Sequence, residues 1–136
     1  MNKDIMQHRK RINMAFLYRP SILVLKKNEN LGKKTVKKLS KEGLIVTEVD
    51  DLDEAKNQLT LVNYDAVIVL EKKDNFFSEK ELAPFFSYSV LVIGPEDSKS
   101  KTISQISFLK SSELDSKLVP EILNLIEGKK LNIKAA

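Results

Sequence analysis

Short apolar runs alternate along this sequence with segments of helical periodicity, and this alternation restricts the fold more than any other feature. The sequence predicts five strands, at residues 21–25, 44–49, 66–70, 89–93 and 106–109. Strands that alternate with helices form a parallel sheet, because each crossover helix returns the chain to the same edge. We therefore predict an α/β domain with a flavodoxin-like, doubly wound, five-stranded parallel sheet.

The expected helices lie between these strands. The first turns Gly32, Val36 and Leu39 inward and ends at Gly43, a residue type that commonly caps helices. The second has its inner face at Leu52, Ala55, Leu59 and Val62, after a cap at Asp50 or Asp51. A short helix is expected between Ser78 and Phe86 and a weak one within residues 97–106. The last begins at Asp115 or Ser116, has Pro120 near its first turn and stops at Gly128.

The domain is predicted to cover residues 20–128. Residues 1–19 form a basic amino-terminal extension, in which Ile5, Ile12 and Phe16 could line one side of a helix, and residues 129–136 form a carboxyl-terminal tail. No apolar run approaches the roughly 18 residues of a membrane span, and no secretory signal is recognisable. A cytoplasmic protein is therefore expected.

Charge is divided unevenly along the chain. Residues 1–41 carry 12 basic and 2 acidic residues, whereas residues 42–136 carry 11 basic and 17 acidic ones. One face of the first predicted helix holds much of the positive charge, at Lys33, Lys34, Lys37, Lys38 and Lys41. Such a face is usually solvated, but it could also contact an acidic protein or nucleic acid. Because no aromatic residues alternate with these lysines, nucleic acid is a less favoured partner than an acidic protein.

The residue inventory excludes most catalytic sites. The chain has no cysteine and a single histidine, His8, so thiol nucleophiles, disulfides, multi-histidine metal sites and histidine-based triads are ruled out. Its four glycines match no phosphate-binding loop. We expect no enzyme activity and no cofactor.

The stretches SILVLKKNEN, YDAVIVLEKK, SVLVIGPE and SFLKSSELDSKLVPEIL, with the order and length of the elements, resemble the receiver domain of bacterial two-component response regulators. The resemblance covers about residues 20–128 and implies the strand order 2-1-3-4-5. In that family an acid pair after the first strand holds Mg²⁺, and an aspartate after the third accepts a phosphoryl group. A Ser or Thr follows the fourth strand and a lysine the fifth.

This chain departs from the receiver pattern at these positions. The acid pair aligns with Lys26 and Lys27, and the phosphoacceptor with Leu70, or with Glu71 if the register slips by one residue. Gly94 takes the Ser/Thr position. The family's lysine aligns with Ser111, or with Lys110 if the loop is shorter. Lysine cannot ligate Mg²⁺ and leucine has no nucleophile, so we expect phosphorylation to be lost.

Two interpretations of the residues that replace the pocket stay open. Glu71 could form ion pairs with Lys26, Lys27 and Lys110, or all four side chains could be solvated at the strand ends. The resemblance implies a partner surface that would include Lys99, Ile103, Phe108 and Lys110. Any of the aromatic residues 76, 77, 85, 86 and 88 left exposed would also mark an interface, although most are expected in the core.

The leading hypothesis is a degenerate pseudo-receiver that works as a signalling or regulatory protein-interaction module, with another signalling protein or a second copy as partner. The first alternative is a flavodoxin-like domain that binds a nucleotide or other anion through Lys26 and Lys27. The second alternative is a basic nucleic-acid-binding accessory domain.

Overall fold

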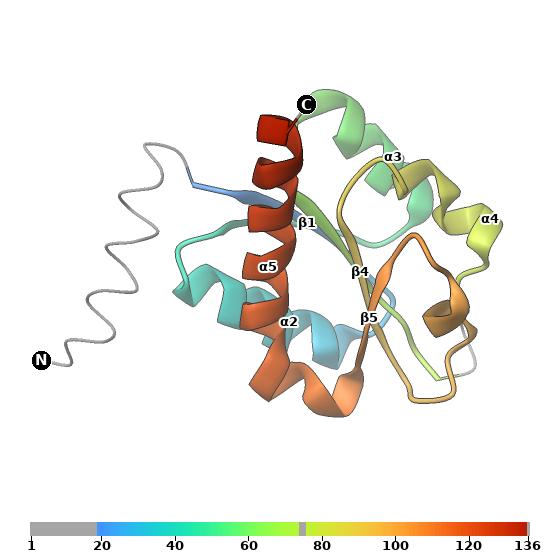
Figure 1. The fold of residues 1–136 in the computed structure, drawn as a ribbon. Helices are drawn as coiled ribbons and strands as arrows, with labels where there is room; N and C mark the ends of the chain where they lie inside the picture. The colour runs from blue at the N-terminus through green and yellow to red at the C-terminus, as the bar shows by residue number, and fades with distance from the viewer. Residues whose placement is uncertain (1–18, 74–75, 136) are drawn as a thin grey trace, which may run out of the picture.

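A computed structural model describes residues 19–73 and 76–135 as a parallel sheet covered by helices on both faces (Figure 1). The strands are β1 (Ser21–Lys26), β2 (Ile45–Val49), β3 (Ala66–Leu70), β4 (Val90–Gly94) and β5 (Ser107–Lys110). The α-helices are α2 (Glu29–Lys41), α3 (Leu52–Leu61), α4 (Glu79–Leu82) and α5 (Leu114–Ala135). Short 3₁₀ helices are η1 (Ala83–Phe85), η2 (Lys99–Thr102) and η3 (Ser111–Glu113).

All strand pairs are parallel and their order is β2-β1-β3-β4-β5, which confirms the predicted fold class and topology. Each strand lies within about one residue of its predicted range, because continuous apolar runs of this length suit strands that are covered on both faces. Every residue of β3 and of β4 is buried. These two strands form the centre of the domain.

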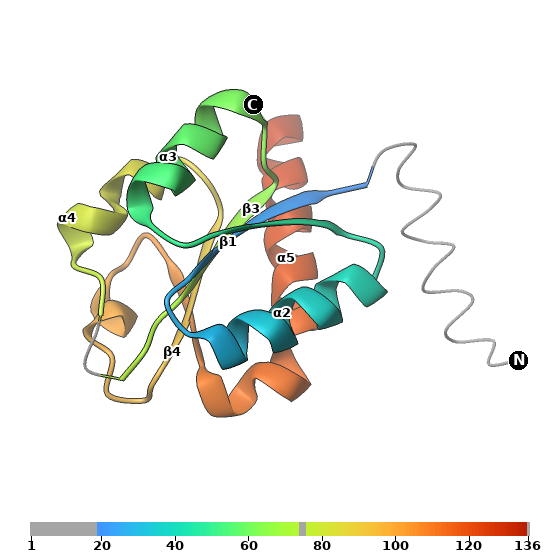
Figure 2. The same ribbon diagram turned by 180° about the vertical axis from the view of Figure 1, so that it is seen from behind.

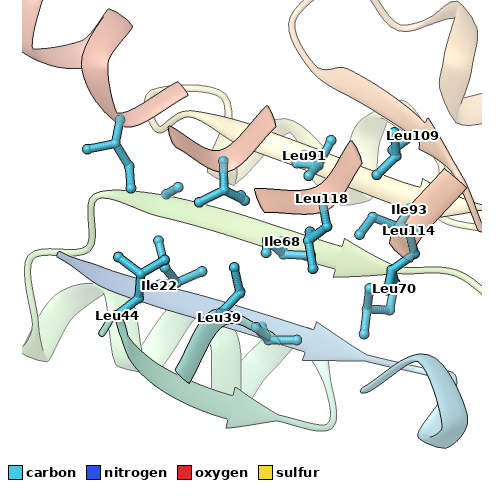
Figure 3. Packing of buried hydrophobic residues seen from close by; sticks show 14 residues of the cluster. Ile22, Leu39, Leu44, Ile68, Leu70, Leu91, Ile93, Leu109, Leu114 and Leu118 are labelled. Atoms are coloured by element: carbon cyan, nitrogen blue, oxygen red, sulfur yellow. The ribbon is translucent and has the colours of Figure 1, made fainter. Parts of the chain in front are cut away.

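Helices cover both faces of the sheet (Figures 1 and 2), and an apolar layer on each face holds them there. On one face, alternate strand residues such as Ile22, Ile68 and Leu91 pack against α2 and α5 (Figure 3). On the other face, the intervening strand residues pack with Tyr64, Phe77, Phe85 and residues of α3 and α4. Phe77 and Phe85 are therefore core residues, whereas Phe76, Phe86 and Tyr88 are half-buried, so fewer of these aromatics are fully buried than expected.

Local signals fix the ends of the helix α2. The side chain of Asn28 accepts a hydrogen bond from the Leu31 amide at 3.2 Å, which caps the start. At the other end Gly43 has a φ of 86°, a left-handed conformation that few residues other than glycine adopt. The helix buries Gly32, Thr35 and Leu39, so Thr35 replaces the predicted Val36 as an inward residue.

Two expectations about the carboxyl-terminal third are wrong. Residues 97–106 contain only the 3₁₀ helix η2, because the side chains of Ser98 and Ser100 turn into the core and a regular α-helix does not form. The last helix begins at Leu114 after η3 and continues through Gly128 to Ala135, with Pro120 inside it. Gly128 does not adopt the positive φ that ends α2 at Gly43, so it weakens the helix without stopping it.

The suggested helix with Ile5, Ile12 and Phe16 lies outside the described residues. Over the part of the chain that the structure describes, no helix combines the length and apolar content needed to cross a membrane.

Candidate functional site

The carboxyl ends of the strands bring the predicted pocket residues to one edge of the sheet. Lys26 is the register partner of Leu70, and Gly94 is the register partner of Lys110. The Glu71 amide donates to the Ile93 carbonyl at 2.8 Å, which carries the β3 chain one residue further along this edge. In α/β sheets this edge is where ligands usually bind.

Lys26 is held by carboxylates rather than directed toward β3. Its ammonium group lies 3.4 Å from Glu29 Oε2, 3.4 Å from Glu48 Oε1 and 3.7 Å from Asp50 Oδ1, and its side chain is 18% exposed. Desolvation lowers the pKa of Lys26, but the hydrogen bond with Glu48 and the charges of Glu29, Glu48 and Asp50 outweigh it, so the pKa is raised. Lys26 is thus a charged group neutralised within the domain.

Lys27 extends toward the other face of the sheet. Its ammonium group lies 4.3 Å from the centre of the Phe77 ring, a cation–π contact. The pKa of Glu81, near the start of α4, is lowered chiefly by a hydrogen bond from the Ser78 amide, and the charge of Lys27 adds to this effect. Lys27 therefore helps to position the segment that leads from β3 into α4.

Leu70 and Glu71 point to opposite faces at the end of β3. Leu70 is fully buried among Ile93, Leu114 and other residues beneath α2 and α5 (Figure 3). Glu71 is the next residue, and its side chain enters the face that α3 and α4 cover. The position that aligns with the phosphoacceptor aspartate is thus a core leucine, and the neighbouring acid has no exposed surface.

Glu71 is the centre of a buried polar cluster that we call the Glu71 latch, formed by Glu71, Phe77, Ser98 and Ser100. Its Oε2 accepts hydrogen bonds from the Phe77 amide at 2.9 Å and from Ser100 Oγ at 2.6 Å, and its Oε1 accepts one from Ser98 Oγ. The Ser100 amide donates to Ser98 Oγ at 3.1 Å. The latch ties the β3–α4 connection to the β4–β5 connection.

Gly94 makes room for this carboxyl group. A Cβ atom at position 94 would lie 2.9 Å from Glu71 Oε1, closer than real Cβ atoms come to a neighbour, and 3.1 Å from Glu71 Cβ, tighter than most such contacts. Any larger residue, including the Ser or Thr that the receiver pattern has here, would collide with the side chain of Glu71. Gly94 and Glu71 therefore depend on one another.

At the end of β5, the register places Lys110 beside Gly94, and Ser111 begins η3. The Lys110 ammonium group lies 3.1 Å from Glu96 Oε1, and this hydrogen bond, together with the charges of Glu96 and Glu113, raises the pKa of Lys110. Glu71 therefore forms neither of the two predicted arrangements. Its hydrogen-bond donors are hydroxyl and amide groups, and it is not solvated.

The residues of the predicted partner surface differ in exposure. Lys99 is exposed, and Phe108 and Lys110 are half-buried. Ile103 is only 8% exposed because it packs in the core layer with Phe77, so it contributes little to such a surface. On α2, Lys33, Lys34, Lys37 and Lys41 are exposed, whereas Lys38 is half-buried and lies 3.4 Å from Asp115.

The strand ends do not fit a divalent metal ion. Mg²⁺ requires several oxygen ligands, and the two positions that would supply them carry ammonium groups. Within residues 19–73 and 76–135, no three His, Asp or Glu side chains group in a way that could hold a metal ion. Lys26 Nζ supplies a positive charge to Glu48 and Asp50 instead.

Sequence reasoning missed Ser98 and Ser100. They lie 27 and 29 residues from Glu71, and serine hydroxyls in a polar loop give no signal of burial. The one clue in the sequence was that an acid, Glu71, follows one fully apolar strand and a glycine, Gly94, follows the next. Beside the latch is an open pocket of about 620 Å³, lined by Phe76, Phe77, Ser78, Glu79, Glu81, Lys99, Thr102 and Ile103.

No protein-family model matches the sequence, and the comparison with curated proteins gives no match. Among solved structures, the chain is similar to the signal receiver domain of an HD domain-containing protein from Pseudomonas fluorescens, with a TM-score of 0.76 and 17% identity over 89% of this chain and 96% of that one. It is also similar to the receiver domain of the hybrid histidine kinase CckA, with a TM-score of 0.61 and 15% identity over 78% and 98% of the two chains.

A third similar structure is described as one of a family of redox sensors in the streptococci that evolved from two-component response regulators. It has a TM-score of 0.69 and 19% identity, and the match covers 86% of this chain and 55% of that one. At sequence identities of 15–19%, these matches show a similar fold only. This chain has a receiver-like fold.

Proposed function

We propose that this chain is a pseudo-receiver, a signalling module that accepts no phosphoryl group and acts by binding another protein. The burial of Glu71 in the latch carries the proposal. A phosphoacceptor must present a carboxylate oxygen to an incoming donor and needs a cation to neutralise the transferred group. Glu71 has no exposed surface, and both of its oxygens accept hydrogen bonds from within the domain.

The neighbouring positions support the same conclusion. Leu70 has no nucleophilic atom and is a core residue. Lys26 and Lys27 stand where a metal site would need oxygen ligands, and an ammonium group has no lone pair to offer a divalent ion. We expect no enzyme activity from this edge of the sheet.

The Glu71 latch also supports the proposal that the domain keeps a single conformation. In receivers the Ser or Thr after the fourth strand responds to the phosphoryl group, but Gly94 has no hydroxyl. The loop that would move is already joined to Glu71 by Ser98 and Ser100. Because a ligand shifts an equilibrium only through different affinities for two states, a domain without the trigger should present one constant surface to its partner.

A nucleotide or anion site at the strand ends has weaker support. Lys26, one of its two proposed cations, is already surrounded by three carboxylates that would repel an anion. Lys27 is engaged over the Phe77 ring.

Incubation with MgCl₂ and acetyl phosphate, followed by intact mass spectrometry, tests the loss of phosphorylation. A phosphorylatable receiver domain treated in parallel controls for the reagent. We expect the control to gain the mass of a phosphoryl group and this protein to remain unmodified. A stoichiometric adduct that disappears in a Glu71→Gln variant would overturn the proposal.

Protein binding is tested separately with the protein as bait in an extract of the source cell. Substitution of Lys99 and Lys110 by glutamate reverses two charges near β5 without touching the latch. A partner retained by the unaltered bait and lost by this variant supports a protein-interaction role for the predicted surface. Equal retention by both baits contradicts that placement.

A further inference from the structure

The exposed side of α2 carries a dense and uncompensated positive charge. Lys33, Lys34, Lys37 and Lys41, which we call the α2 lysine face, are all exposed. No acidic residue lies between positions 30 and 41. Within the part of the chain that the structure describes, no acid lies within ion-pair distance of these four lysines.

Three lysines elsewhere in the domain are matched by acids. Lys26 is close to three carboxylates, Lys110 pairs with Glu96, and Lys117 pairs with Glu113. On α2, by contrast, residues four positions apart carry the same charge and repel one another. A polyanion on this face would relieve that repulsion.

We propose that the α2 lysine face binds the phosphate backbone of nucleic acid without reading its sequence. Lys33, Lys37 and Lys41 follow one another at four-residue intervals, which is about 6 Å per step and about 12 Å in total along the helix axis. Each strand of a duplex carries one charge per roughly 3.4 Å of the axis, so this length matches about three or four phosphates of one strand. Lysine ammonium groups bind phosphate as point charges and do not require a shaped pocket.

The composition of the face favours nucleic acid over a protein or a membrane. The exposed large apolar side chains of the described residues are Ile45, Leu61 and Val62, none of which belongs to α2. Protein interfaces usually need an apolar or aromatic centre, and lysine is depleted there. The apolar side of α2 packs on the sheet and α5, so it cannot enter a bilayer. A phosphate backbone, by contrast, can be bound through charge alone.

Fluorescence anisotropy with a labelled DNA duplex of arbitrary sequence tests the proposal. We expect binding at low salt, with log K falling against log salt at a slope of about −2.7 to −3.6 for three or four phosphate contacts. The triple variant Lys33→Gln, Lys37→Gln, Lys41→Gln should bind at least about tenfold more weakly at the same salt concentration. The matched control removes three exposed charges elsewhere, at Lys56, Lys80 and Lys99, and should retain most of the affinity.

Four results would each overturn the inference. One is the absence of binding at low salt. Another is an equal loss of affinity in the α2 variant and the matched control, which would mean that binding depends on net charge alone. A third is loss only when Arg9, Lys10 and Arg11 are substituted, which would assign binding to the amino-terminal extension. The fourth is binding to vesicles that contain phosphatidylserine but not to the duplex.

Discussion

Replacement of Glu71 by alanine should destabilise the domain strongly, because it removes the acceptor for three buried donors. Phe77, Ser98 and Ser100 each donate to this carboxyl group, and a buried donor left without its acceptor costs about 1–3 kcal/mol. The three bonds belong to one network, so their contributions do not add. Burial of the carboxyl group also has a cost that the variant avoids. We expect the free energy of unfolding to fall by about 3 kcal/mol.

Urea unfolding followed by circular dichroism measures this change, and two further variants test its cause. Glu71→Gln keeps the shape and one carbonyl acceptor, so it should cost less, about 1–2 kcal/mol. Ser100→Ala removes a single donor. If the latch is cooperative, Ser100→Ala should be nearly neutral when Glu71 is already alanine.

Two outcomes would refute this reasoning about the latch. The first is a Glu71→Ala variant whose stability lies within about 0.5 kcal/mol of the unaltered protein, the range of ordinary surface substitutions. The second is an effect of Ser100→Ala that is the same in both backgrounds, which would mean that the two side chains do not interact.

Three other substitutions or titrations test separate parts of the structure. Gly94→Ala should lower the free energy of unfolding by about 1–3 kcal/mol through its clash with Glu71, and a urea series should show that the cost disappears in the Glu71→Ala background. Thr35→Val should raise the thermal midpoint, with a gain of about 1 kcal/mol, because the buried Thr35 hydroxyl has no hydrogen-bond partner among the residues that the structure describes; a lower midpoint contradicts this. The hydrogen bond from Lys117 lowers the pKa of Glu113, so this carboxylate stabilises the fold above its ordinary pKa, and the contribution is lost as pH falls through the lowered value. A carboxyl NMR titration that shows a raised pKa for Glu113 would disprove the last point.

The strands and their order were predictable because the signal is local and repeated. Each apolar run has the length of a buried strand, and the intervening helices force parallel pairing. Gly43 was also a dependable signal, since its positive φ of 86° is the conformation that glycine favours at a helix end. Gly128 gave the same signal but lies inside α5, because a glycine ends a helix only where the following chain turns away.

The interior of the site was not predictable, because its bonds join residues far apart in sequence. The replacement of acids by Lys26 and Lys27 could be read directly. The ion-pair partners of Lys26 could not be predicted, because Lys26 pairs with Glu48 and Asp50, which follow α2 in the sequence, rather than with Glu71. Likewise, the residue that fills the space above Gly94 becomes apparent only when β3 and β4 lie side by side.

The most direct test of the central claim is a Mg²⁺ titration of ¹⁵N-labelled protein followed by amide chemical shifts. With Lys26 neutralised by carboxylates and Glu71 enclosed in the latch, we expect no saturable shift at residues 26–28 and 70–72 or at Gly94 and Glu96. A saturable shift confined to these strand ends would show that the edge of the sheet still binds a divalent cation, and it would contradict the account.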